Sequence, residues 1–307
     1  ALGLGGDLPS TPPAHPTAIS LIEQALALHP DPSPVRALLL CRLAERRHRL
    51  DTGAARLRLV DEAVAIARPT GDDELLARVM LSRVRALHGP DAMVEMLEIS
   101  SEVDRIATLL PDDALAVRSA QVRMNAAFVL SDLGTAVQAA RITSVLAGRL
   151  RQPEYQRLPL MWDAFQAMYE GRFDAGAAVA NELTALLGGR HSQTTALVGA
   201  LLMPQLVFQG QTELAYEMTR DLDVPYRDAL LGWFAAETGA LDRARHHLRA
   251  LGSVSNIVAD ANWSWWQGMV ATATAASLCG DTALLAEVRE AITAWAHQHA
   301  TAGLVSY

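Results

Sequence analysis

Glycine recurs along the chain at near-regular intervals, and this recurrence limits the possible folds more than any other feature of the sequence. Five glycines each follow one helix-like stretch and precede another, at spacings of 37, 39, 29 and 41 residues: Gly134, Gly171, Gly210, Gly239 and Gly280. Such a period is typical of stacked helical hairpins, in which each repeat contacts only its neighbours. Three of these segments have an alanine four or five residues after the glycine (Ala175, Ala215 and Ala244), and a residue of this size lets two helices approach closely.

The spacing of apolar residues supports the same fold class. Several segments place apolar side chains in steps of 3, 4 and 3, which puts them on one face of a helix; one such quartet is Leu241, Ala244, Leu248 and Leu251. No comparable alternating run indicates a strand. Between the first two helical stretches, Ser33 is a suitable N-cap and Pro34 a suitable first helical residue. We therefore predict an all-α fold, a right-handed superhelix of stacked helical hairpins.

The domain organisation is predicted to be simple. Residues 1–16 are rich in glycine and proline and are expected to form a linker or an extended arm. No later break is long or polar enough to separate two domains, so residues 17–307 are predicted to form one helical repeat domain. The chain begins without an initiator methionine and stops directly after a helical stretch, which indicates a fragment of a longer chain.

Composition excludes several classes of protein. The formal net charge is -8, and all 26 basic residues are arginines, so a free-standing nucleic-acid-binding role is not expected. No run of 18 uncharged apolar residues indicates a membrane span, and no signal peptide is recognised. Cys41 and Cys279 lie in apolar helical stretches and are predicted to be buried free thiols, as in a reducing cytoplasm.

A cluster of tryptophans is the first candidate site. Three of the six tryptophans occur within four residues of the segment Asp260–Trp266, and Trp263 and Trp266 share one helical face. One interpretation is packing between neighbouring helices. The other is a stacking platform in a groove, with Asp260 and Asn262 orienting a polar ligand.

The second candidate site lies near the middle of the chain. Its polar and aromatic residues have helical spacings and are expected to line a groove: Tyr155, Arg157, Trp162, Asp163 and Gln166, with Arg123 and Asn125 on the neighbouring helix. Arg123 or Arg157 is suited to hold a carboxylate or phosphate with two hydrogen bonds. The alternative is that these arginines form ion pairs between helices.

Patterns for catalysis or metal binding are missing from the sequence. Adjacent histidines such as His246 and His247 leave a helix at different angles, and they are predicted to lie on the surface. We find no GxSxG, HExxH, P-loop or dinucleotide-binding motif. The chain is therefore predicted not to be an enzyme and to need no cofactor or metal.

Four segments carry a resemblance to known proteins. They are the opening ALGLGG, the stretch LVDEAVAIARPTGDDELLARVMLSRVRALHGPD, the block RQPEYQRLPLMWDAFQAMYEGRFDAGAAVANEL and DANW at Asp260–Trp263. The chain resembles the tetratricopeptide-like region of large actinobacterial regulators, among them LuxR-type ATP-binding transcriptional regulators, Streptomyces antibiotic regulatory proteins and cyclase-linked ATPases. In such proteins this region follows a nucleotide-binding module, so the resemblance implies a tetratricopeptide-like solenoid that serves a regulator.

The function expected from these observations is a cytoplasmic, non-enzymatic sensor or interaction module of a transcriptional regulator. Its partner would be a protein, a peptide, another domain of the parent chain or a regulatory ligand, bound in the concave groove. Two alternatives remain open: a small-molecule effector domain with an enclosed aromatic pocket, and a self-associating scaffold. Direct contact with nucleic acid or membrane is not expected.

Overall fold

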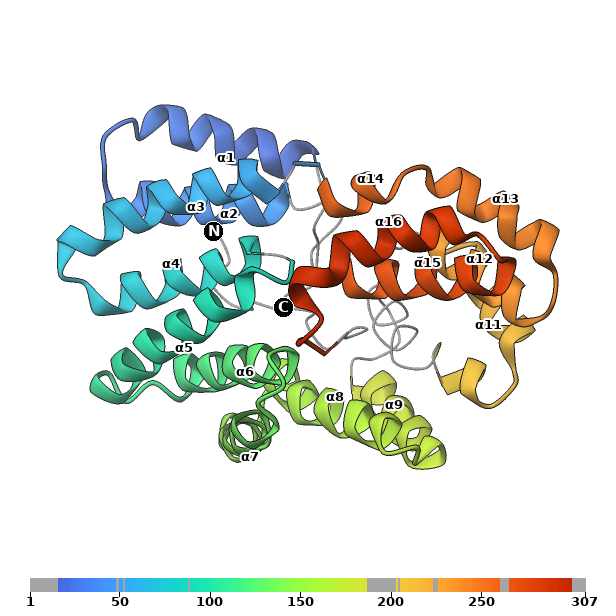
Figure 1. Ribbon diagram of the computed structural model, residues 1–307. Coiled ribbons are helices and arrows are strands. Elements are labelled where there is room, and N and C mark those ends of the chain that lie inside the picture. Colours follow the sequence, from blue (N-terminus) through green and yellow to red (C-terminus); the bar gives the residue numbers. More distant parts are fainter. Residues whose placement is uncertain are drawn as a thin grey trace. The chain divides into compact units, whose positions relative to one another are not determined.

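The computed structural model describes residues 16–47, 50–51, 53–87, 89–186, 203, 205–222, 226–259 and 265–299. These residues are almost entirely helical, and no strand occurs among them (Figure 1). The helices are α1 (Pro16–Leu28), α2 (Pro34–Arg46), α3 (Gly53–Ala67), η1 (Arg68–Thr70), α4 (Asp73–Ala86), α5 (Ala92–Leu109), α6 (Asp113–Val129), α7 (Leu133–Leu150), α8 (Pro153–Tyr169), α9 (Phe173–Leu186), α11 (Thr212–Arg220), α12 (Arg227–Glu237), α13 (Leu241–Leu251), α14 (Val254–Ala259), α15 (Trp265–Cys279), α16 (Thr282–Ile292) and η2 (Thr293–Trp295). Within the described segments, none of the helices is both long and apolar enough to cross a membrane.

The chain divides into two compact units, residues 1–158 and 159–306. In the first unit, successive helices pack as neighbours from α1 to α7, and α2, α4 and α6 also contact one another in sequence order. In the second unit, α11, α12 and α13 pack in succession, and α12 and α13 also contact α15. Contacts between each helix and its first and second neighbours are what stacked hairpins produce. The predicted all-α class with helices packed in neighbouring pairs is confirmed.

The turns between paired helices repeat one hydrogen-bond pattern. At Gly239, which has a φ of +78°, the Gly239 N–H donates to the Ala236 carbonyl at 3.0 Å. The next N–H, of Ala240, reaches back to the Ala235 carbonyl at 2.9 Å. This pair of bonds ends a helix by satisfying two of its last carbonyl groups, and glycine adopts the required positive φ without steric cost. The same two bonds recur at Gly171, Gly210 and Gly280.

Gly134 is different from the other four glycines. The expectation that it lies between two helices is wrong, because it is the second residue of α7. The turn lies three residues earlier, at Ser131, which has a φ of +66°. Asp132 then caps α7: its side chain accepts a hydrogen bond of 3.0 Å from the Thr135 N–H. An aspartate cap therefore starts the helix before the glycine is reached.

A small, buried residue follows the turn by five positions in four of the repeats. The residues are Ala136, Gly176, Ala215 and Ala244, and the three alanines are fully inaccessible to solvent. The alanine predicted for the Gly171 repeat, Ala175, lies beside the buried position and is only half-buried. A side chain of this size allows close approach of the next helix, as expected from the sequence.

Other local predictions are met to different degrees. Ser33 caps α2 by accepting from the Arg36 N–H at 3.2 Å, and Pro34 is the first residue of the helix. Cys41 is a buried free thiol, and burial raises its pKa to about 12, so it stays protonated at neutral pH. Cys279 is only half-buried. Of the predicted arm, residues 1–15 lie outside the described residues, whereas Pro16 begins α1.

Helix α8 contains a proline in its interior. Pro159 has no N–H, so it cannot donate the backbone bond that the carbonyl of Tyr155 would otherwise accept. The division between the two compact units falls at the same place, after Leu158.

The two kinds of glycine give opposite expectations for substitution by alanine. Gly239→Ala is expected to destabilise the fold by about 1 kcal/mol, because an alanine at positive φ is strained even though no atom lies within 4 Å of the added methyl group. Gly134→Ala is expected to be neutral or to stabilise by up to about 1 kcal/mol, since it replaces glycine within a helix. Urea unfolding midpoints of both variants test this, and shifts in the same direction would contradict the assignment of the turns.

Candidate functional site

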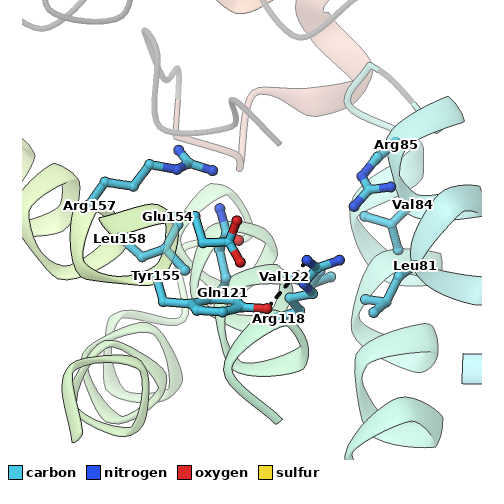
Figure 2. A pocket seen from close by; sticks show the side chains of 10 residues that line it. All are labelled: Leu81, Val84, Arg85, Arg118, Gln121, Val122, Glu154, Tyr155, Arg157 and Leu158. Carbon is cyan, nitrogen blue, oxygen red and sulfur yellow. Dashed lines mark hydrogen bonds between the residues drawn. The ribbon is translucent and has the colours of Figure 1, made fainter. Parts of the chain in front are cut away.

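A pocket in the first unit collects charged side chains from three helices. Counted out to its open mouth, its volume is about 440 Å³ (Figure 2). Its walls come from α4, α6 and α8, and its lining residues are Leu81, Val84, Arg85, Arg118, Gln121, Val122, Glu154, Tyr155, Arg157 and Leu158. Three of them are arginines, although the chain as a whole is acidic.

The repeat architecture explains why the three arginines meet. Arg85, Arg118 and Arg157 are separated by 33 and 39 residues, close to the spacing of the turn glycines. Residues that recur at the repeat period occupy similar places on successive hairpins and therefore lie side by side. Of these three arginines, the spacing of residues within one helix identifies Arg157 alone as a candidate. Arg85 and Arg118 are identified by a different signal, the recurrence of arginine at the repeat period.

Two of the arginines are held in place by neighbouring side chains. Arg85 forms an ion pair with Glu45 of α2, which also binds Arg42 at 2.8 Å. Arg118 donates to the Tyr155 hydroxyl at 3.4 Å, and its guanidinium carbon lies 5.8 Å from the centre of the Tyr155 ring. The tyrosine thus positions Arg118 both by a hydrogen bond and by a cation–π contact.

Arg157 is the most buried of the three, with only 6% of its surface exposed. Burial lowers the pKa of Arg157 to about 10; the nearby Glu154 opposes this change, while the charges of Arg118 and Arg85 add to it. At neutral pH the side chain therefore still carries its charge. A guanidinium kept charged in a buried position costs stability unless anionic or hydrogen-bonding groups compensate it.

Asn125 lies on α6, one turn beyond Gln121 on the same face of the helix. The residue is 1% exposed, and neither atom of its side-chain amide hydrogen bonds to any residue that the structure describes. Buried polar groups are normally hydrogen-bonded, so an amide in this state identifies a place where a further partner would be favourable.

The remaining residues of the second candidate site have other surroundings. Arg123 leaves α6 on a different face and forms an ion pair of 3.0 Å with Asp104 of α5, in agreement with the alternative interpretation. Trp162 is buried in α8, with its ring centre 5.9 Å from that of Phe165. Asp163 as a whole residue is exposed, but its carboxyl is partly buried. This partial burial is the main reason that the pKa of Asp163 is raised, and the negative charge of Glu182 adds to the rise.

The tryptophan cluster is described only in part. Asp260, Asn262 and Trp263 lie outside the described residues. Trp265 and Trp266 pack edge to face with ring centres 4.9 Å apart, and both belong to a core cluster in the second unit. For Trp266 this arrangement favours packing over a stacking platform.

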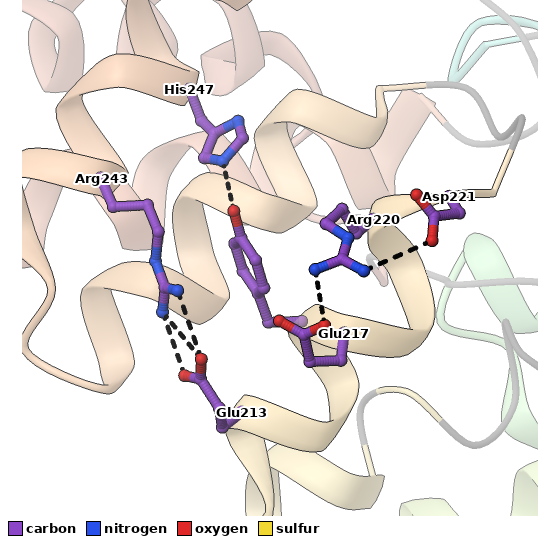
Figure 3. A network of polar contacts seen from close by, with 7 residues as sticks. Glu213, Glu217, Arg220, Asp221, Arg243 and His247 are labelled. Atoms are coloured by element: carbon purple, nitrogen blue, oxygen red, sulfur yellow. Dashed lines mark hydrogen bonds and ion pairs between the residues drawn. The ribbon is translucent and has the colours of Figure 1, made fainter.

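A second polar network joins α11 and α13 (Figure 3), and a contact to Asp228 extends it to α12. His247 contacts Asp228 through Nδ1 and the Tyr216 hydroxyl through Nε2, both at 2.9 Å. Arg243 lies over the Tyr216 ring, 4.1 Å from its centre, and forms an ion pair of 3.0 Å with Glu213. The surface position predicted for His247 is therefore wrong. The network connects three helices. Tyr216, at its centre, is only 7% exposed, so the network offers little access to a substrate.

Histidine, cysteine and carboxylate side chains are not grouped for metal binding in the part of the chain that the structure describes. No family model matches this chain, and no curated protein matches it significantly. The likeness to tetratricopeptide-like regions of regulators therefore rests on the sequence segments quoted above.

The state of Asn125 can be tested by replacing it with a residue of similar size. Asn125→Leu is expected to stabilise the unliganded protein by about 1 kcal/mol, because the change removes a buried amide without losing a hydrogen bond. The control is Ser119→Ala on the same helix. The buried Ser119 hydroxyl donates to the Ser100 carbonyl at 2.6 Å, so this variant is expected to lose about 1 kcal/mol. Urea unfolding measures both, and equal losses would show that Asn125 is hydrogen-bonded within the protein.

Proposed function

We propose that this chain is a non-enzymatic sensor or interaction module and that the pocket between α4, α6 and α8 binds an acidic group of its ligand. The observation that carries the proposal is the convergence of three guanidinium groups, from three different hairpins, on one pocket. Arginine presents its donors in a planar fork that fits carboxylate and phosphate groups.

Two further observations support a binding role for this pocket. Its lining joins apolar side chains such as Leu81 and Val84 to a few charged and polar groups, the combination usual in small-molecule sites. The most buried of its charges, Arg157, has a pKa lowered mainly by burial, and strongly perturbed groups at a pocket are concentrated at functional sites. An anion bound beside Arg157 would offset the loss of hydration that burial imposes on the guanidinium.

The test is calorimetric titration of the 307-residue chain with glutarate and, separately, inorganic phosphate. Arg157→Met and Arg118→Met are each expected to weaken binding of an anion about 10- to 100-fold, the effect of losing a charge-assisted hydrogen bond. The matched control is Arg149→Met, because Arg149 lies in the same unit with 63% of its side chain exposed. Absence of binding by both anions, or equal weakening in all three variants, would overturn the proposal.

We further propose, on the resemblance alone, that the module serves a cytoplasmic transcriptional regulator and changes the state of a nucleotide-binding module. A ligand shifts such an equilibrium only if it binds one conformation better than the other. In the full-length protein, an anion that binds the pocket is therefore expected to change the rate of ATP hydrolysis, and Arg157→Met is expected to abolish the change. Equal ATP turnover and equal melting temperature with and without the anion would exclude this coupling.

A further inference from the structure

Helix α7 has one face packed into the first unit and one face open to solvent. On the packed face, Leu146 and Ala147 belong to a core cluster with residues of α6 and α8; α6 lies beside α7 in Figure 1. The opposite face carries two β-branched residues one turn apart, Ile142 and Val145, which are 38% and 57% exposed. Residues three apart on a helix are neighbours, so these two side chains form one small apolar patch in the middle of α7.

The charge around this patch is opposite to that of the whole chain. Residues 133–153 contain three arginines and no acidic residue, although the chain has a net charge of -8. Arg149 already contacts Asp113 at 3.9 Å. Arg141 and Arg151 are exposed and form no ion pair with any residue that the structure describes. Attraction to the negative end of the helix dipole accounts for Arg151 but not for Arg141, which lies in the middle of α7.

The C-terminal end of α7 places glycine and arginine at unusual positions. Gly148 lies inside the helix, where glycine costs stability compared with alanine, and a Cβ atom added there would meet nothing within 4 Å. Arg151 has a left-handed φ of +51°, a conformation in which glycine is favoured. The packing of α7 therefore requires neither a glycine at 148 nor an arginine at 151. Close approach of a partner to Gly148, and a charge pair at Arg151, would account for both.

The shape and charge of this face indicate the kind of partner that fits it. Gln138, Ile142, Val145 and Gly148 follow one another in steps of four and three, which makes a ridge against which a second helix can pack. The arginines beside the ridge are suited to carboxylates. An anionic membrane fits less well, because the ridge offers only two apolar side chains and no aromatic residue to enter the lipid.

We propose that the outer face of α7 is a docking surface for an acidic amphipathic helix of a partner protein. Apolar side chains of that helix lie on Ile142 and Val145, its backbone approaches Gly148, and its carboxylates pair with Arg141 and Arg151. None of these residues lines the pocket between α4, α6 and α8, so the docking surface is independent of the ligand proposed for that pocket.

Binding of a synthetic peptide to the 307-residue chain tests this assignment. The probe is a fluorescent, hydrocarbon-stapled amphipathic peptide of about 18 residues, with leucines along one face and glutamates beside them. The control peptide has lysine in place of every glutamate. Fluorescence anisotropy at low ionic strength is expected to show at least about tenfold tighter binding of the glutamate peptide, and added salt is expected to weaken it.

Variants with matched controls locate the binding surface. Val145→Glu and Arg141→Glu are each expected to weaken binding of the glutamate peptide about tenfold or more, because each brings a carboxylate against like charges. The controls lie on α5 and are expected to leave binding unchanged: Val94→Glu, at a valine that is 58% exposed, and Arg105→Glu, at an exposed arginine. Gly148→Gln is expected to weaken binding while the melting temperature stays equal or rises, a combination that a purely structural role does not produce.

The proposal is overturned if neither peptide binds, if both bind equally, or if the variants on α5 weaken binding as much as those on α7. It is also overturned if phosphatidylserine vesicles bind more tightly than the glutamate peptide and Arg141→Glu abolishes this, because the face then belongs to a membrane. Salt-sensitive oligomers of the protein alone that Val145→Glu disperses would instead assign the face to a second copy of the chain. Circular dichroism confirms that each variant is folded.

Discussion

The close approach of neighbouring helices, made possible by a tight turn, is the constraint on which the rest of the structure depends. A helix commonly reverses direction within a few residues by placing one residue at positive φ and by finding donors for its last carbonyls. Gly239 and its counterparts meet the first condition, and the paired bonds to the preceding turn of helix meet the second. Once the turn is made, a small residue such as Ala244 lets the following helix pack without a gap.

Much of this architecture can be predicted from the sequence, because glycine and aspartate have few competing roles at helix ends. The turn glycines, the Ser33 cap and the apolar faces all follow from local chemistry. The prediction for Gly134 is wrong for a local reason as well: Ser131 can adopt a positive φ, and Asp132 starts the next helix before the glycine. The handedness and course of a superhelix depend on small rotations between repeats, which local patterns do not specify, so the right-handed superhelix stays a prediction.

The candidate site is less predictable, since it depends on which residues different repeats bring together. Arg157 and Arg123 are equally suitable anion-binding residues in the sequence; in the structure Arg157 lines the pocket and Arg123 forms an ion pair with Asp104 of α5. The spacing within one helix cannot distinguish these two cases, because each arginine's partners come from other helices. Comparison of positions one repeat apart joins Arg157 to Arg118 and Arg85. Glu154 does not stand out in the sequence, because a single glutamate at a helix start is commonly a favourable interaction with the helix dipole.

The proline in α8 has a mechanical consequence. A helix resists bending through its ladder of backbone hydrogen bonds, and α8 lacks one rung where Pro159 follows the pocket residues Tyr155 and Arg157. The same point separates the two compact units along the chain. Bending of α8 directly after the side chains that form the pocket wall is therefore opposed by one backbone hydrogen bond fewer than in the rest of the helix.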